Sequence, residues 1–160
     1  MNNNDILRRI RYTFDFDDFK MIELFNQGGK TVSRSEVSNW LKKDTDPDFQ
    51  FIDDSSLEVF LNGFIIEKRG KKEGAEPIPA SKLNNNLIFR KLKIALNLKD
   101  DDILEILTLA DFRFSKHELS AIFRNPSQSQ YRICKDQVLR NFLHGIQVKY
   151  RDNKNQKPPQ

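Results

Sequence analysis

The sequence contains an internal duplication, which limits the possible folds more than any other feature. Residues 3–70 align with residues 85–152 at a constant offset of 82 positions, without a gap. Fifteen of the 68 aligned positions are identical, and many others exchange one apolar residue for another. A repeat of this kind marks two copies of one structural unit. We therefore expect two similar units, residues 3–70 and 85–152, joined by a linker over residues 71–84.

Each unit has the apolar spacing of four helices. Apolar residues recur at intervals of three and four positions, and no segment alternates in the way that a half-buried strand does. The predicted fold class is therefore all-α, with two tandem four-helix units. In the first unit the apolar clusters span 6–14, 21–25, 37–41 and 57–64, and in the second unit they lie 82 positions later.

Short polar residues precede these clusters and predict where the helices begin. Their side chains accept hydrogen bonds from the free N–H groups of a first turn. Ser33 with Glu36, and Ser115 with Glu118, also fit the reciprocal capping box. We interpret most of the polar identity between the copies as helix capping. The predicted caps are Asn4, Asp18, Ser33 and Asp54, with their matches Asn86, Asp100, Ser115 and Asp136.

Two matched glycines interrupt the fourth helical pattern of each unit. Gly63 and Gly145 occupy positions where glycine costs about 1 kcal/mol relative to alanine in a helix. We expect them to allow a close helix–helix approach, at a place where the two copies meet.

Several runs of the sequence are typical of one family: residues 3–8, 60–63, 67–71, 84–86, 90–92, 98–104 and 136–137. Through these runs the chain resembles the uncharacterised bacterial YehS-like family. The resemblance covers almost the whole chain and implies a small cytoplasmic bacterial protein made of two like halves. The family has no established activity, so the resemblance transfers no catalytic residue.

Residues 21–43 resemble the helix-turn-helix of DNA-binding repressors. Val37 and Trp40 would form the inner face of a recognition helix, and Arg34, Ser38 and Asn39 would point outward to read bases. The second copy keeps only part of this pattern, and the turn is longer than in most such motifs. A capped helix hairpin that serves the core would give the same pattern.

Basic residues form a second candidate surface for nucleic acid. Residues 3–70 hold 10 basic and 13 acidic side chains, whereas residues 85–152 hold 12 basic and 8 acidic ones. Clustered cations bind phosphates, although a solvated helix face or charge-guided docking of the two halves would also explain the pattern. The candidates on helices one and three are Arg8, Arg11, Arg90, Lys93, Lys116 and Arg124.

The residues give little support for an enzyme, a cofactor or a metal site. The acidic run at 44–48 begins like a calcium loop but has Phe49 and Ser55 where glycine and glutamate are required. Cys134, in an apolar setting, is the single cysteine, which predicts an inert thiol and a reducing cytoplasm. No stretch approaches the about 20 apolar residues that span a membrane.

The expected function is a non-enzymatic binding module without a cofactor. Nucleic acid and a protein partner are both candidate ligands, and the alternative is a small regulatory protein–protein adaptor with no nucleic-acid contact. The polar segment 153–160 is expected to be a disordered tail.

Overall fold

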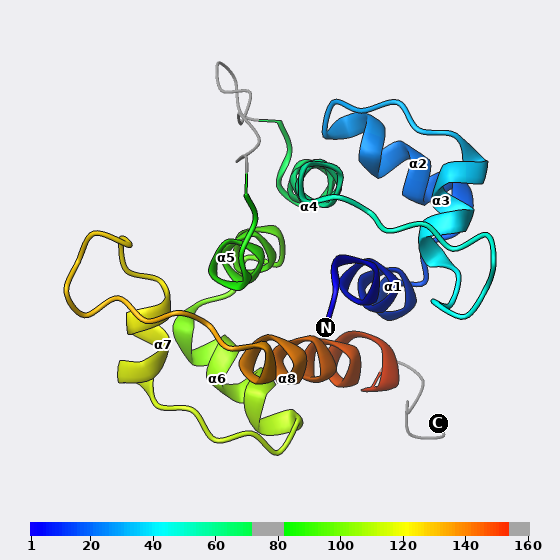
Figure 1. Ribbon diagram of the computed structural model, residues 1–160. Helices are drawn as coiled ribbons and strands as arrows, with labels where there is room; N and C mark the ends of the chain where they lie inside the picture. Colours follow the sequence, from blue (N-terminus) through cyan, green and yellow to red (C-terminus); the bar gives the residue numbers. More distant parts are fainter. Residues whose placement is uncertain (72–81, 154–160) are drawn as a thin grey trace.

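The computed structural model describes residues 1–71 and 82–153, and all regular structure within them is helical (Figure 1). The fold is two tandem four-helix units, as the sequence predicts. Most of the predicted linker (72–81) and of the predicted tail (154–160) lies outside the described residues. The helices are α1 (Asn3–Phe14), α2 (Asp18–Gln27), α3 (Arg34–Leu41), α4 (Asp54–Arg69), α5 (Asn85–Ala95), α6 (Asp100–Leu109), α7 (Lys116–Ile122) and α8 (Asp136–Gln147), which continues into a π-helical turn, η1 (Val148–Asp152).

The third helix of each unit begins where the sequence predicts. Ser33 Oγ accepts a hydrogen bond from the Glu36 N–H (3.1 Å), and a Glu36 carboxylate oxygen accepts one from the Ser33 N–H (3.0 Å). Ser115 and Glu118 form the same two bonds at the start of α7. The serine and the glutamate that the two copies share at this place are therefore conserved between them as a capping box.

The other six predicted caps are wrong by one or two positions. The N-caps of α2 and α4 are Asp17 and Asp53, each one residue before the predicted cap. In the second unit the cap positions of α6 and α8 hold Lys99 and Lys135. The matched aspartates lie in the first turn instead, where negative charge interacts favourably with the helix dipole. The six residues predicted as caps that lie inside the first turn are Asp18, Asp54, Asp100, Asp136, Asn4 and Asn86.

Asn4 and Asn86 are buried inside the first turn of α1 and α5, where they connect three segments. Asn4 Nδ2 donates to the carbonyls of Trp40 (2.9 Å) and Gln50 (2.8 Å), and Asn4 Oδ1 accepts from the Ile52 N–H (3.2 Å). The true cap of α1 is Asn2. Asn86 makes the three equivalent bonds, with Ile122, Arg132 and Cys134.

Four helices form the centre of the molecule, and the α2–α3 and α6–α7 hairpins flank them on opposite sides (Figure 1). The first helix of each unit packs mainly against the fourth helix of the other unit: α1 against α8, and α5 against α4. The two units therefore share one core.

The four central helices all begin at the same end of this core. The Asp54 carboxylate, in the first turn of α4, accepts from Asn3 Nδ2 (2.8 Å) and from the Leu83 N–H (3.1 Å), which lie at the starts of α1 and α5. Asn85 Nδ2 donates to the Asp136 carboxylate at the start of α8 (2.7 Å). At the opposite end, the Phe14 ring contacts those of Phe64 and Tyr150.

Gly63 and Gly145 mark close helix approaches, but inside each unit. A Cβ on Gly63 would lie 1.8 Å from the Leu24 carbonyl oxygen in α2, and a Cβ on Gly145 would lie 2.1 Å from that of Ile106 in α6. Our expectation that they lie where the copies meet is wrong, because the fourth helix crosses the second helix of its own unit at these glycines.

Candidate functional site

The arginines predicted on the first helices of the two units bind the ends of the third helices. Arg8 donates to the Lys42 carbonyl (2.5 Å) and pairs with Asp5, and Arg90 donates to the Phe123 carbonyl. Carbonyls at a helix C-terminus lack intrahelical partners, so these bonds complete α3 and α7. The matched arginines thus have a structural role in the fold.

The neighbouring cations Arg11 and Lys93 are also only half exposed. Arg11 Nε is buried without a hydrogen-bond partner among the described residues. Lys93 Nζ lies 2.9 Å from the Asp100 carboxylate and 4.5 Å from the centre of the Phe123 ring. A phosphate would have to compete with these contacts.

The candidates on the third helices are divided between two distant hairpins. Arg34 pairs with Asp18 (3.1 Å), and Lys116 lies 3.9 Å from Asp101. Both cations are exposed, and α3 and α7 lie at opposite edges of the molecule (Figure 1). Each predicted recognition helix therefore begins beside acidic residues of the preceding helix.

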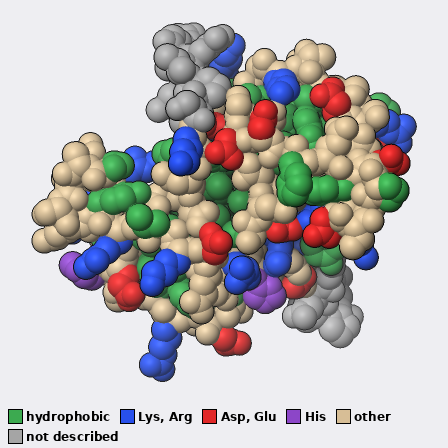
Figure 2. Space-filling view, in the orientation of Figure 1, with side chains coloured by type: hydrophobic (Ala, Val, Ile, Leu, Met, Phe, Trp, Pro, Cys, Tyr) green, Lys and Arg blue, Asp and Glu red, His purple; other side chains and the backbone are tan. Residues whose placement is uncertain are grey.

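The remaining candidates have local partners or lie partly buried. Asn39 Oδ1 accepts from Lys42 Nζ (2.9 Å), and Ser38 is half-buried. Arg124 donates to the Gln130 side chain within its own loop. On the face drawn in Figure 2, Lys and Arg side chains are interspersed with Asp and Glu. The nine predicted residues do not form one continuous basic surface.

Two exposed apolar side chains occupy equivalent positions in the two units. Phe51 precedes α4 and is 72% exposed, and Ile133 precedes α8 and is 76% exposed. Both lie at the end of the core where the four central helices begin. Sequence reasoning assigned them no role, although their alignment at an apolar position outside the helical clusters was a usable signal.

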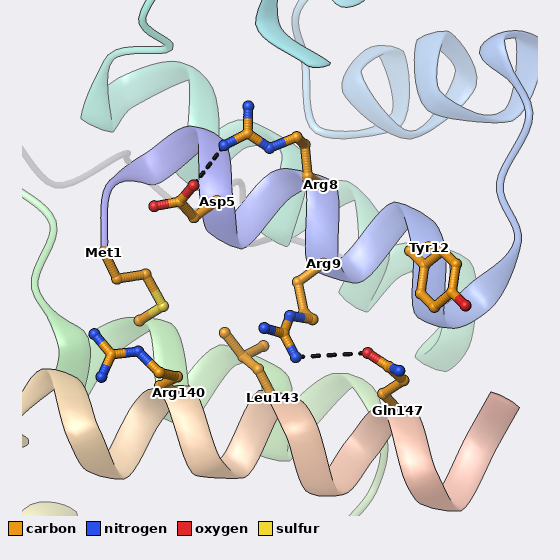
Figure 3. A pocket seen from close by; sticks show the side chains of 8 residues that line it. All are labelled: Met1, Asp5, Arg8, Arg9, Tyr12, Arg140, Leu143 and Gln147. Atoms are coloured by element: carbon orange, nitrogen blue, oxygen red, sulfur yellow. Dashed lines mark hydrogen bonds and ion pairs between the residues drawn. The ribbon is translucent and has the colours of Figure 1, made fainter. Parts of the chain in front are cut away.

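A pocket of about 560 Å³ lies between α1 and α8 (Figure 3). Arg9 extends from α1 towards α8, where its guanidinium lies 3.5 Å from Gln147 Oε1. Arg140 extends from α8 beside Met1, and the buried Leu143 lies between the two arginines. Arg8 and Asp5 also line the pocket, so three arginines and one acid give it a net positive lining. The sequence did not indicate this, because Arg9 and Arg140 are 131 positions apart.

Comparison with known proteins assigns the chain to a family. A family model described as a protein of unknown function, DUF1456, matches residues 3–70 and again residues 85–152. The chain belongs to the DUF1456 family. The protein YehS of Escherichia coli, itself described as uncharacterised, is 42% identical over 147 residues, which cover 91% of this chain and 94% of that protein. No solved structure gives a significant match.

The duplicated DUF1456 unit therefore corresponds to four helices, α1–α4 or α5–α8. Among the residues that the structure describes, no group of three or more His, Cys, Asp or Glu side chains is arranged to hold a metal ion. In this member Cys134 is buried, and burial raises the pKa of its thiol to about 12. Within residues 1–71 and 82–153, no helix is both long and apolar enough to cross a membrane.

Proposed function

We propose that the protein is a non-enzymatic binding module that docks another protein on the end of its core where Phe51 and Ile133 are exposed. The repetition of this exposed apolar position supports the proposal. Each of the two exposes about three-quarters of a large apolar side chain, and covering such surface with a partner is favourable. The duplication presents such a side chain twice at one end of the molecule.

Phe51 has acidic neighbours in the sequence and Ile133 has basic ones, which indicates the charges expected on the partner's surface. Asp48 and Asp53 are exposed near Phe51 in the sequence, whereas Arg132 and Lys135 are exposed on either side of Ile133. Complementary charge favours specificity and the rate of association. We expect the partner surface to carry a basic group beside one apolar contact and an acidic group beside the other.

Affinity capture from nuclease-treated lysate tests this proposal, with the full chain, the double variant Phe51→Ser/Ile133→Ser and the control Leu109→Ser as baits. Leu109 is an exposed apolar residue on α6, which is not one of the four central helices. The proposal predicts a partner that the wild type and the control retain and that the double variant loses. The same proteins retained by all three baits, or none by any, would contradict it.

A nucleic acid is the second candidate ligand, and the exposure of Arg34 and Lys116 favours it. The first turn of a recognition helix is the part that contacts bases and phosphates. Loss of one phosphate contact lowers the slope of log affinity against log salt by about 1. We expect Arg34→Ala and Lys116→Ala each to do so with mixed DNA or RNA, while Arg113→Ala, an exposed change between α6 and α7, leaves the slope unchanged.

We also place the protein in the bacterial cytoplasm. The relative at 42% identity comes from a bacterium. The single cysteine is a buried thiol, which is compatible with a reducing compartment. Fractionation of the source cells, with the chain recovered outside the cytoplasmic fraction, would refute this placement.

A further inference from the structure

The duplication supplies an internal comparison for the pocket between α1 and α8. The α1–α8 contact and the α5–α4 contact are the same pair of elements, first helix on fourth helix, taken from opposite units. A comparison of their side chains therefore shows which groups belong to one contact and not to the other. The comparison concerns a different surface from the one around Phe51 and Ile133.

The α5–α4 contact contains a nearly buried ion pair. Lys91 Nζ lies 2.7 Å from Asn62 Oδ1 and 3.6 Å from a Glu58 carboxylate oxygen, and the Lys91 and Glu58 side chains are only 16% and 4% exposed. The charge of the lysine is therefore matched within the contact. The other residues equivalent to the pocket lining are mainly apolar: Leu61, Ile65, Leu83, Leu87 and Ile94.

The α1–α8 contact has an arginine at the position of this acid. Arg140 replaces Glu58, and Arg9 replaces Lys91. Arg140 makes no hydrogen bond or ion pair with the described residues, and Arg9 has only the long bond to Gln147. Asp5, Tyr12 and Gln147 stand in the α1–α8 contact at the positions of Leu87, Ile94 and Ile65, so this contact is also more polar. Met1 stands at the position of Leu83.

The acid in the pocket does not neutralise the two arginines. The Asp5 carboxylate pairs with Arg8, and in Figure 3 this pair lies on the side of α1 away from α8. Hydrogen bonding by Asn2 and Arg8 outweighs burial and lowers the pKa of Asp5, so this carboxylate stays charged and engaged at neutral pH. Arg9 and Arg140 thus line the pocket without an acid that pairs with them among the described residues.

We propose that this pocket binds a small phosphate monoester. Guanidinium groups match the oxygens of a phosphate bidentately and remain charged at all relevant pH values. Leu143, the Met1 side chain and the Tyr12 ring supply apolar lining for the organic part of the ester. A volume of about 560 Å³ lies in the range of small-molecule sites.

The most direct test replaces Arg140 with the residue that occupies the equivalent position in the α5–α4 contact, Glu58. Arg140→Glu places in the α1–α8 contact the acid that Glu58 provides in the α5–α4 contact. The substitution removes one guanidinium group of the anion site, and we expect the new carboxylate to pair with Arg9 as Glu58 pairs with Lys91. We expect the variant to remain folded and to lose binding of phenyl phosphate at least tenfold. Arg113→Glu changes the net charge equally on an exposed residue outside the pocket and should leave the affinity within twofold.

The measurement is a titration of the full chain with phenyl phosphate followed by NMR, with phenol as the uncharged control. The proposal predicts saturation below about 10 mM for phenyl phosphate, shifts at residues of α1 and α8, and none with phenol. Arg9→Gln, which keeps the size of the side chain similar, should weaken binding as well and covers the case in which Arg140→Glu fails to fold. Absence of saturation, equal affinity in Arg140→Glu, or equal loss in Arg113→Glu would overturn the proposal.

Discussion

At the scale of single residues, the positions that the two copies share are mostly those that hold the segments of a unit together. Asn4 connects α1 to the end of α3 and to the extended segment before α4, and Asn86 does the same in the second unit. The identity is visible in the sequence, but its role is not. An asparagine near a helix start is typical of a cap, and only the tertiary fold shows that its amide is buried among three backbone groups.

We predict that Asn4→Ala lowers the free energy of unfolding by about 2–3 kcal/mol, because two carbonyls and one N–H lose their partner in a buried place. Urea unfolding followed by fluorescence measures the change. Asn26→Ala, at an exposed position of α2, is the matched control and should stay within about 0.5 kcal/mol of the wild type. Equal effects of the two substitutions would contradict the assigned role of Asn4.

At the scale of helices, the apolar spacing predicts how many there are and roughly where they lie, but not which helices meet. Gly63 illustrates the difference: a glycine within a helical pattern indicates a close approach, and the structure places α2 there. The predicted partner was the other copy, because the sequence does not encode which surface a helix faces. Cap positions were similarly displaced, either because a neighbouring residue such as Asp53 also caps or because a lysine, Lys99 or Lys135, occupies the cap position.

Gly63→Ala is expected to destabilise the protein by about 1–3 kcal/mol, although alanine is the better helix former. The added Cβ would lie 1.8 Å from the Leu24 carbonyl oxygen, which is backbone and moves only with α2. Thr108→Ala on the exposed side of α6 is the control, in which helix propensity improves and only the exposed bond from the Thr108 hydroxyl to the Leu104 carbonyl is lost. Thermal unfolding of both variants decides the matter, and a gain in stability for Gly63→Ala would refute the close approach.

At the scale of the whole molecule, the two copies interlock. Each first helix packs on the fourth helix of the other unit, and all four central helices begin at one end. The sequence predicted a shared interface but not this exchange, since both arrangements bury the same apolar faces. The candidate sites follow from the exchange: the arginines of the α1–α8 pocket come from different units, and so do Phe51 and Ile133.

The central claim is that the two units form one cooperative core, and two natural probes test it. Trp40, the single tryptophan, reports on the first unit by fluorescence. Cys134, the single cysteine, reports on the second by pulse labelling, because burial raises its pKa to about 12 and keeps the folded thiol unreactive. Ile106→Ala creates a cavity within the second unit, where α6 meets α8, and should cost about 2–4 kcal/mol.

The decisive measurement is the urea midpoint of each probe in the wild type and in Ile106→Ala. If the core is shared, both probes change at one midpoint in the wild type, and the substitution lowers the two midpoints equally. A Trp40 midpoint that stays in place while the Cys134 midpoint falls would show that the units unfold separately, and would contradict the account.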